Sequence, residues 1–406
     1  MSNTLKLGNG KWATGKDTLL SFSDTNNNYK PLPFSFSRDS SGTVINKDGL
    51  IEAVGSGEPR IDFKDNTKGS LLLEPSRSNL LPYSEDFSIV NWSKYGSGTG
   101  VAPTVTSNYA ISPDGTLNAS RVQFDKGTGT TGSDMSILND NVAVTSGITT
   151  SKSVYVKSNT SEEYDIVVYG ASSASGTNLK KVRVTNQWQR FDVYGTIPSN
   201  TTGITIGLRE INVTGLSNTA DVLVWGAQLE QGSYATSYIP TSGGAVTRVA
   251  DVCNNGANEQ VINSTEGVLY LETKGFIDVP SSSEYIQLSK NGEASFNNSL
   301  TIQHRNNGYL RVYVNGTATS GIHFNENIDF TENHKIAVLY KLNGYKLFID
   351  GVSQSLFGTP TQTVFSGLDN LSFDLRDALN WNGSIKDVRI YNTALTDQEL
   401  IALTTI

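Results

Sequence analysis

The sequence has little of what supports disulfide-stabilised folds or nucleic-acid binding. Cys253 is the only cysteine among 406 residues, so no intramolecular disulfide can form, and we expect a buried free thiol. Charged residues make up 17% of the chain, the net charge is −8, and Lys180–Lys181 is the only adjacent basic pair. Because binding to a phosphate backbone needs clustered Lys and Arg, these features argue against a nucleic-acid partner.

Motifs of catalysis and cofactor binding are missing as well. We expect structural roles for the three histidines, His304, His323 and His334, which belong to a strand-like run or lie near loops. The chain has no phosphate-binding loop, no dinucleotide fingerprint and no His-Glu-x-x-His pattern. Glu85–Asp86 and Glu162–Glu163 are adjacent carboxylates, and neighbouring side chains on a strand point to opposite faces. We therefore predict no enzyme, no catalytic residue, no metal ligand and no cofactor.

Long apolar runs are also absent. No uninterrupted stretch approaches 18 apolar residues, and the N-terminal MSNTLKLGNGKWATGKD lacks a basic stretch followed by an apolar core. These features predict neither a membrane insertion nor a signal peptide. Gly, Ser, Thr and Asn are abundant instead, hydrophobic residues make up 37%, and proline occurs at only 11 positions. This composition is typical of turn-rich β proteins.

Alternating polar and apolar runs support that interpretation. Runs such as Ser153–Lys157 and Arg190–Tyr194 are separated by turn-forming residues, a pattern typical of β-sandwiches and jelly rolls. Asn343–Gly344, between two later runs, predicts a hairpin with positive φ at the glycine. Thr396 and Glu399 have the spacing of a capping box and predict a short terminal helix.

The predicted fold class is all-β, with two β-sandwich (jelly-roll) domains preceded by an extended β-rich N-terminal arm. Residues 1–80 are too short and polar for a large core, so we expect an attachment arm packed on a neighbouring module or on a partner subunit. Residues 81–247 are expected to form the first sandwich and residues 266–406 the second. Residues 248–265 lack periodicity and are expected to be a linker.

The last module resembles concanavalin A-like sandwiches of the laminin-G and pentraxin type. The resemblance rests on HKIAVLYKLNGYKLFIDGV (His334–Val352), WNGSIKDVRIYNTALTDQEL (Trp381–Leu400) and GVLYLET (Gly267–Thr273), which occur in the family's order. It implies a sandwich fold over residues 266–406.

The middle module is similar to carbohydrate-binding jelly rolls. The similarity is carried by Asn79–Leu81 with Phe87 and Trp92, by QWQRF (Gln187–Phe191), and by DVLVWGAQLEQG (Asp221–Gly232). Cellular members commonly have adjacent acidic residues in the closing strand that help to hold calcium. This chain has Trp225–Ala227 there, so the resemblance implies the fold but not the calcium site, and whether calcium binds is left open.

The paired phrases SLLLEPSRSNLLPYSEDF (Ser70–Phe87) and GAQLEQGSYATSYIPTSG (Gly226–Gly243), with FSRDSSGTVINKDGLIEAVGSGEPRIDF (Phe36–Phe63), resemble bacteriophage structural proteins. The resemblance implies a virion surface protein of the fibre or appendage type, made in the host cytoplasm and joined to other virion proteins by its arm. Its action would be non-catalytic binding of host glycans. The alternatives are a purely structural or head-decoration protein and a polysaccharide depolymerase. Host, ligand, position on the virion and copy number are left open, as is a homo-oligomeric state.

Aromatic residues are the usual platforms of sugar sites. The tryptophans of the strand phrases and several loop tyrosines are candidates by residue type, although core packing is the commoner use of each. No binding residue is assigned among these candidates, which are Trp92, Trp188, Trp225, Trp381, Tyr109, Tyr285 and Tyr309.

Overall fold

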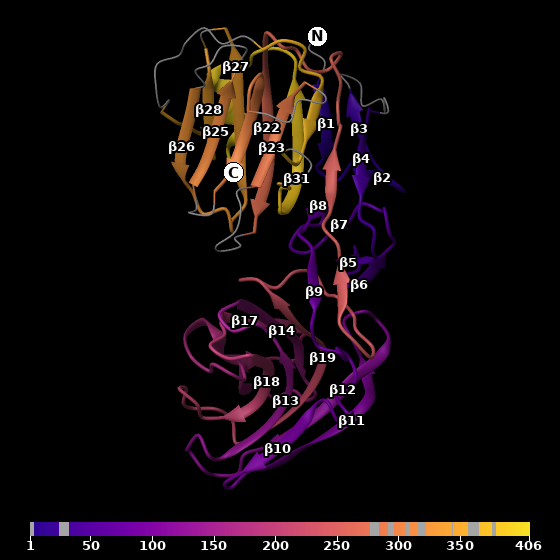
Figure 1. The fold of residues 1–406 in the computed structure, drawn as a ribbon, viewed down its shortest axis with the longest axis vertical. Helices are drawn as coiled ribbons and strands as arrows, with labels where there is room; N and C mark the ends of the chain where they lie inside the picture. Colours follow the sequence, from indigo (N-terminus) through magenta and orange to yellow (C-terminus); the bar gives the residue numbers. More distant parts are fainter. Residues whose placement is uncertain are drawn as a thin grey trace. The chain divides into compact units, whose positions relative to one another are not determined.

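The computed structural model describes residues 4–23, 32–276, 284–290, 296–305, 309–315, 322–342, 344–355, 365–375 and 379–406. Within these ranges the regular secondary structure consists of strands, with one α-helix, α1 (Asp397–Thr404), and one 3-10 turn, η1 (Gly176–Asn178). The all-β prediction is therefore confirmed. The chain divides into two compact units (Figure 1). Unit 1 contains Met1–Asp48, Ala53–Ser76 and Val249–Ile406, and unit 2 contains Gly49–Glu52 and Arg77–Arg248.

Unit 2 is a sandwich of two antiparallel sheets. The order of the first sheet is β10–β13–β18–β15–β16 and that of the second is β11–β12–β19–β14–β17. The strands are β10 (Ser93–Ser97), β11 (Val101–Ile111), β12 (Leu117–Asp125), β13 (Met135–Ala143), β14 (Thr149–Ser158), β15 (Tyr164–Gly170), β16 (Leu179–Val184), β17 (Gln189–Thr196), β18 (Thr201–Arg209) and β19 (Thr219–Gln231). A separate pair joins β9 (Arg77–Asn79) to β20 (Val246–Arg248).

The core of unit 2 forms where apolar residues alternate along facing strands. Leu138 and Ile206 from the first sheet pack with Val154 and Val224 from the second, and all four are fully buried. Side chains on a strand alternate between its two faces. The residues next to these four along each strand therefore point outward, away from the core. The outward face of the first sheet carries the candidate site described below.

Unit 1 is also a two-sheet sandwich. The order of its larger sheet is β21–β4–β3–β1–β31–β22–β27–β28–β29, with β2, β7 and β8 attached beside it, and that of its smaller sheet is β26–β25–β24–β23–β30. Leu269 and Val388 from the larger sheet share a core with Ile302 and Val312 from the smaller one.

The larger sheet consists of β1 (Thr4–Gly8), β2 (Ala13–Gly15), β3 (Thr18–Ser23), β4 (Leu32–Ser37), β7 (Ile61–Asp62), β8 (Ser70–Leu73), β21 (Val252–Asn254), β22 (Glu266–Gly275), β27 (His334–Lys341), β28 (Lys346–Ile349), β29 (Val352–Ser353) and β31 (Gly383–Tyr391). The smaller sheet consists of β23 (Glu284–Ser289), β24 (Ser299–His304), β25 (Tyr309–Asn315), β26 (Ile322–Asn327) and β30 (Asn370–Ser372). A separate two-stranded sheet pairs β5 (Gly42–Ile45) with β6 (Ile51–Val54).

The N-terminal segment is built into unit 1. Strand β1 lies between β31 and β3, with Leu5 opposite Ile390 and Leu7 opposite Val388, and Figure 1 shows β1 and β31 side by side. Leu5 and Leu7 are buried in the same core as the C-terminal strands. From the sequence we expected this segment to pack on a neighbouring module or on a partner subunit. In the structure it packs on the second sandwich, and its strand β1 pairs with β31.

The segment expected to be a linker is part of unit 1 from Val249 onward. Strand β21 pairs with β4, and Cys253 in β21 is buried together with Val261 and Ile262. Residues 249–265 therefore belong to unit 1 and contribute these three buried side chains to its core, although their apolar residues follow no regular period. The buried thiol predicted at Cys253 is confirmed, and burial raises its pKa well above the ordinary value.

An ion cluster, which we define as Arg38, Arg60, Glu74 and Asp251, joins three parts of unit 1. The Asp251 carboxylate accepts from Arg38 Nη1 at 3.0 Å and from Arg60, and Arg60 Nη1 donates to Glu74 at 2.7 Å. All four side chains are at most 3% exposed. Burial alone would lower the pKa of Arg60, but the charges of Asp251 and Glu74 raise it above the ordinary value. Equal numbers of opposite charges keep this buried site neutral.

Two short-range predictions concern the C-terminal end of the chain. Strands β27 and β28 form the predicted hairpin, with Leu339 opposite Lys346. Asn343 lies outside the described residues, so the positive φ expected at Gly344 stays a prediction. The capping box is confirmed, since the Glu399 amide donates to the Thr396 hydroxyl and the Thr396 amide donates back to the Glu399 carboxylate at 2.8 Å.

Asp140 on β13 is a buried carboxylate, and its Oδ2 has no hydrogen-bond partner among the described residues. Burial raises its pKa to about 6. The folded protein therefore binds this proton more tightly than the unfolded chain does. As a result, the contribution of Asp140 to the free energy of unfolding falls as the pH rises from about 4 to 6. We expect Asp140→Asn to raise the free energy of unfolding at pH 7.5 by about 1–3 kcal/mol.

Urea unfolding of the wild type and Asp140→Asn at pH 4.5 and 7.5 tests this prediction. The gain should be larger at pH 7.5, because at pH 4.5 the folded wild type is already mostly protonated at this position. An equal effect at the two pH values would contradict the assignment.

Candidate functional site

Strands β13 and β18 place a row of polar side chains on the outward face of the first sheet of unit 2. Asn139 and Asn141 lie two residues apart on β13, and Thr201, Thr205 and Arg209 lie at intervals of four on β18. These spacings put each set on one face of its strand. The strands pair antiparallel with Asn139 opposite Thr205, so the two sets form one surface.

Hydrogen bonds hold several of these groups in place. The Thr205 hydroxyl donates to Asn139 Oδ1 at 2.8 Å. Arg209 Nε donates to the Gly132 carbonyl at 3.0 Å, and Arg209 Nη1 donates to the Tyr169 hydroxyl at 3.3 Å. Thr205 and Tyr169 are buried and form the floor, while Asn139 and Arg209 are half-buried and Asn141 is exposed. The guanidinium is thus fixed by neutral partners at one end of the row.

A cavity of about 390 Å³ lies over this row. Its lining combines amides, hydroxyls, one guanidinium and two apolar side chains, with no carboxylate or histidine, and consists of Ile137, Asn139, Asn141, Tyr169, Ala171, Ser172, Ser199, Thr201, Thr205 and Arg209. Such groups can donate and accept hydrogen bonds at fixed positions. Acid–base hydrolysis of a glycosidic bond needs a pair of carboxylates, which this lining does not supply.

The tryptophans of the strand phrases divide into core and surface residues. Trp92, Trp225 and Trp381 are at most 1% exposed. Trp225 packs between Tyr155 and Tyr238, with ring centroids 5.6 and 4.5 Å away. Trp188 is half-exposed, and its indole nitrogen donates to the Ile111 carbonyl at 3.3 Å. None of the four lines the cavity over β13 and β18.

The loop tyrosines are similarly spread out. Tyr109 is 43% exposed and lies 5.1 Å from the guanidinium of Arg121. Tyr285 is buried, and Tyr309 is 38% exposed. The structure does not bring these three residues into one site.

The two histidines whose side chains the structure describes, His304 and His334, are engaged by carboxylates and a backbone carbonyl. His334 Nδ1 lies 2.6 Å from Asp350, and its Nε2 lies 2.8 Å from the Asp329 carbonyl. His304 is buried, with Nδ1 3.6 Å from Glu284. Both rings are held by these contacts within unit 1, and the side chain of His323 lies outside the described residues.

The adjacent carboxylates are engaged separately. Burial raises the pKa of Glu85, which accepts from Tyr238 and Asn118 at 2.8 and 2.9 Å. Hydrogen bonds from Ser88 outweigh the effect of burial and lower the pKa of Asp86. Glu162 and Glu163 are exposed. In the described part of the chain, no three His, Cys, Asp or Glu side chains gather as a metal site would require.

Sequence reasoning missed the residues of the β13–β18 face. Thr205 lies between two isoleucines, as polar residues do on any strand with one solvated face, whereas Asp140 lies between Asn139 and Asn141 and interrupts the alternation on β13. The useful signal is the presence of two amides at alternate positions of one strand. Only the antiparallel register, which sequence does not give, brings them opposite Thr205 and near Arg209.

Comparison with known families and structures gives partial matches. Residues 277–401 match the model of the Concanavalin A-like lectin/glucanases superfamily, which lies within the module expected to have that fold. No curated protein matches the chain. None of the helices in the described ranges has the length and apolar character of a membrane span.

Solved structures of carbohydrate-binding domains are among the matches. The CBM40 of the Ruminococcus gnavus IT-sialidase, bound to alpha2,3 sialyllactose, is 18% identical with a TM-score of 0.30, and the match covers 36% of this chain and 86% of that one. Domain 4 of a Geobacillus stearothermophilus GH43 extracellular arabinanase, in complex with arabinotriose, is 14% identical with a TM-score of 0.30, covering 43% and 82%. Mouse laminin alpha1 domains LG4-5 are 10% identical with a TM-score of 0.24, covering 63% and 88%. Values this low assign neither a ligand nor an activity.

Proposed function

We propose that this protein binds glycans without catalysis, and that the β13–β18 face of unit 2 is a sugar-binding site. The observation that carries the proposal is the row of fixed amide, hydroxyl and guanidinium groups beneath a cavity of about 390 Å³. Sugar hydroxyls both donate and accept hydrogen bonds, so they suit the amides of Asn139 and Asn141. A cavity of this size holds a small ligand of one or two sugar rings.

The biological setting proposed here is the surface of a bacteriophage particle. It is supported by the resemblance of Ser70–Phe87, Gly226–Gly243 and Phe36–Phe63 to phrases of phage structural proteins. In this setting the protein is a fibre or appendage component that contacts host surface glycans and other virion proteins. Mass spectrometry of purified particles, followed by a virion reconstruction, tests the setting and separates a tail position from a head position.

A glycan array with the full chain is expected to give binding that Asn139→Ala weakens about tenfold, because removal of one hydrogen-bonding amide costs roughly 1–1.5 kcal/mol. Asn186→Ala is the matched control, since Asn186 is exposed in the same unit and lies outside the cavity lining. Its affinity should remain within twofold of the wild type.

Two results would contradict the proposal. If no glycan binds and the particles contain the protein in a regular lattice, the protein is a structural or decoration component. If incubation with host polysaccharide releases reducing ends, the protein is a depolymerase and not a passive binder.

A further inference from the structure

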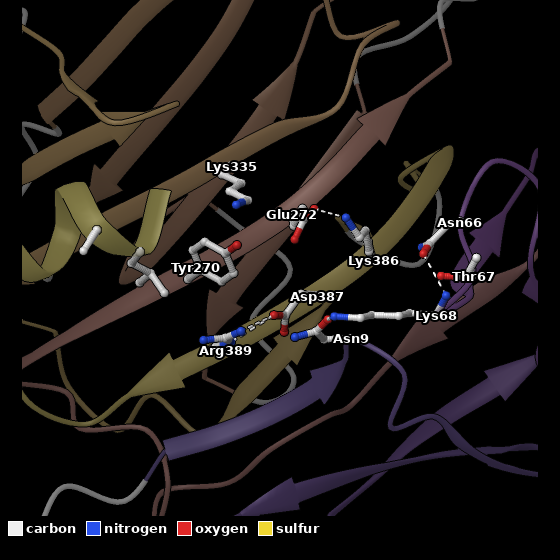
Figure 2. A pocket seen from close by; sticks show the side chains of 12 residues that line it. Asn9, Asn66, Thr67, Lys68, Tyr270, Glu272, Lys335, Lys386, Asp387 and Arg389 are labelled. Carbon is white, nitrogen blue, oxygen red and sulfur yellow. Dashed lines mark hydrogen bonds and ion pairs between the residues drawn. The ribbon is translucent and has the colours of Figure 1, made fainter. Parts of the chain in front are cut away.

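Unit 1 contains a second pocket whose chemistry differs from that of the β13–β18 face (Figure 2). It encloses about 480 Å³ and lies on the outward side of the larger sheet, next to the C-terminal turn of α1. Strands β22, β27 and β31 supply most of its charged residues. The loops after β1 and before β8 close one side with Asn9, Asn66, Thr67 and Lys68.

The strand pattern explains why charged residues meet here. Leu269 and Leu271 on β22 point into the core, so Tyr270 and Glu272 point outward. On β31 the register shifts: Glu272 lies opposite Asp387, and the next residue, Thr273, lies opposite Ile385. Residue 386 is therefore the extra residue of a β-bulge. The bulge adds the Lys386 side chain to the same outward pocket as Asp387.

The pocket has more positive than negative charge. Two of its four cations are matched by carboxylates, because Lys386 pairs with Glu272 and Arg389 Nε donates to Asp387 at 3.0 Å. The other two donate to neutral oxygens in the described structure.

These two cations are Lys68 and Lys335. Lys68 Nζ donates to Asn9 Oδ1 at 2.9 Å, and Lys335 Nζ donates to the Thr405 carbonyl at 2.6 Å. The pocket thus has two cations beyond its carboxylates in a protein whose net charge is −8. A local excess of this sign favours an anionic ligand.

An aromatic hollow adjoins the charged pocket. The hollow encloses about 420 Å³ and shares two lining residues, Thr67 and Lys68, with the pocket, and we name the two together the groove. Trp12, Phe63 and Lys47 line the hollow, and Lys47 Nζ lies 5.4 Å from the centroid of the Phe63 ring. Trp12 is half-buried with its indole nitrogen donating to the Gly69 carbonyl at 2.9 Å, which fixes the ring.

We propose that this groove, defined by Trp12, Phe63, Lys68, Lys335 and Lys386, binds an acidic oligosaccharide. One sugar ring packs against the two aromatic side chains, as the apolar face of a pyranose does on an indole or phenyl ring. The carboxylate or sulfate of the adjoining sugar lies among the three lysines. The groove is separate from the proposed site on unit 2, and its ligand differs because the β13–β18 face has one cation, whereas the two parts of the groove are lined by five cations and two carboxylates.

The test is isothermal titration calorimetry of the full chain with polygalacturonate, dextran sulfate and neutral dextran at 50 and 300 mM NaCl. We expect binding of at least one of the two acidic polymers, weakened by salt, and no binding of neutral dextran in the groove. The polymer that binds with the higher affinity shows whether the groove prefers a carboxylate or a sulfate. Binding of neither polymer would overturn the proposal.

Variants separate the charged and the aromatic ends of the groove. Lys68→Gln combined with Lys335→Gln should weaken acidic-polymer binding at least tenfold and reduce its dependence on salt. The matched control, Lys290→Gln with Lys341→Gln, removes the same charge from exposed positions of unit 1 outside the groove and should change affinity less than twofold.

Phe63→Leu should weaken binding three- to tenfold while leaving the salt dependence unchanged, since it removes a stacking surface and no charge. If Lys290→Gln with Lys341→Gln loses as much affinity as Lys68→Gln with Lys335→Gln, acidic polymers respond only to the net charge of the protein, and the proposed site is wrong. Asn139→Ala should leave acidic-polymer binding unchanged. This variant separates a failure of the groove from a failure of the site on unit 2.

Discussion

A chain that begins at residue 81 is expected to lose the cooperative fold of unit 1 and to keep that of unit 2. The deleted part supplies seven apolar side chains to the shared core of unit 1: Leu5, Leu7, Leu19, Phe34, Phe36, Leu71 and Leu73. At about 1.5–3 kcal/mol for each buried side chain, their loss is comparable with the whole stability of an ordinary domain, about 5–15 kcal/mol. The deletion also leaves β31 without its partner β1 and so creates an exposed sheet edge.

Thermal unfolding followed by near-ultraviolet circular dichroism would check this result on residues 81–406, 77–248 and the full chain. The fragment 77–248 is the control, because it contains both sheets and the core of unit 2. It should melt cooperatively, whereas 81–406 should show only one cooperative transition, at a lower temperature, because it lacks β9 and the buried Asn79 that donates to the Ala227 and Ile239 carbonyls. A second, undiminished transition in 81–406 would mean that the N-terminal segment is a detachable arm, as its sequence suggests.

Replacing Asp251 with asparagine is expected to destabilise unit 1 by about 3–5 kcal/mol, because it leaves Arg38 and Arg60 with a single buried counter-charge. The substitution barely changes the volume of the side chain. The loss would therefore report the charge and not a cavity. Asp251, just before β21, accepts from Arg38, which follows β4, from Arg60, and from the amide of Glu74, which follows β8. The loss would therefore also show that Asp251 holds the ends of β4 and β8 together.

Urea unfolding at pH 7.5 measures this effect, with Lys346→Gln as the control. Lys346 also pairs with an aspartate, Asp397, but the two side chains are 41% and 58% exposed. An exposed pair of this kind contributes about 0–1 kcal/mol. If Asp251→Asn shifts the unfolding free energy by no more than the control does, the cluster is not important for stability.

Local features of the fold were accessible from sequence because local chemistry determines them. The β27–β28 hairpin follows from two alternating runs joined by a turn, and α1 begins where Thr396 and Glu399 can cap it. The alternation of Val154 with its polar neighbours likewise predicted a sandwich strand. These signals extend over a few residues, so no knowledge of distant partners was needed.

The relations between distant segments were not accessible in this way. The pairing of Leu5 with Ile390 joins positions close to opposite ends of the sequence, and no local period identifies such a partner. Asp251 is an ordinary loop residue in sequence and becomes important only where Arg38 and Arg60 converge on it. The candidate sites have the same origin, since the lysines of the groove come from three separate parts of the chain. The four tryptophans considered from the sequence as sugar platforms attract attention by residue type, but three of them are in cores.

The pairing of β1 with β31 sets an order for folding during synthesis. Residues 77–248 form a continuous stretch and can complete unit 2 as soon as they leave the ribosome. Strand β1 is made first but waits for β31, which ends at Tyr391. At elongation rates of about 5–20 residues per second this delay is on the order of 20–80 s. During that interval β1 can pair only with β3, and Leu5 and Leu7 lack the apolar side chains of β31 that cover them, so a nascent chain stalled before β31 should be a preferred substrate for chaperones that bind exposed apolar segments.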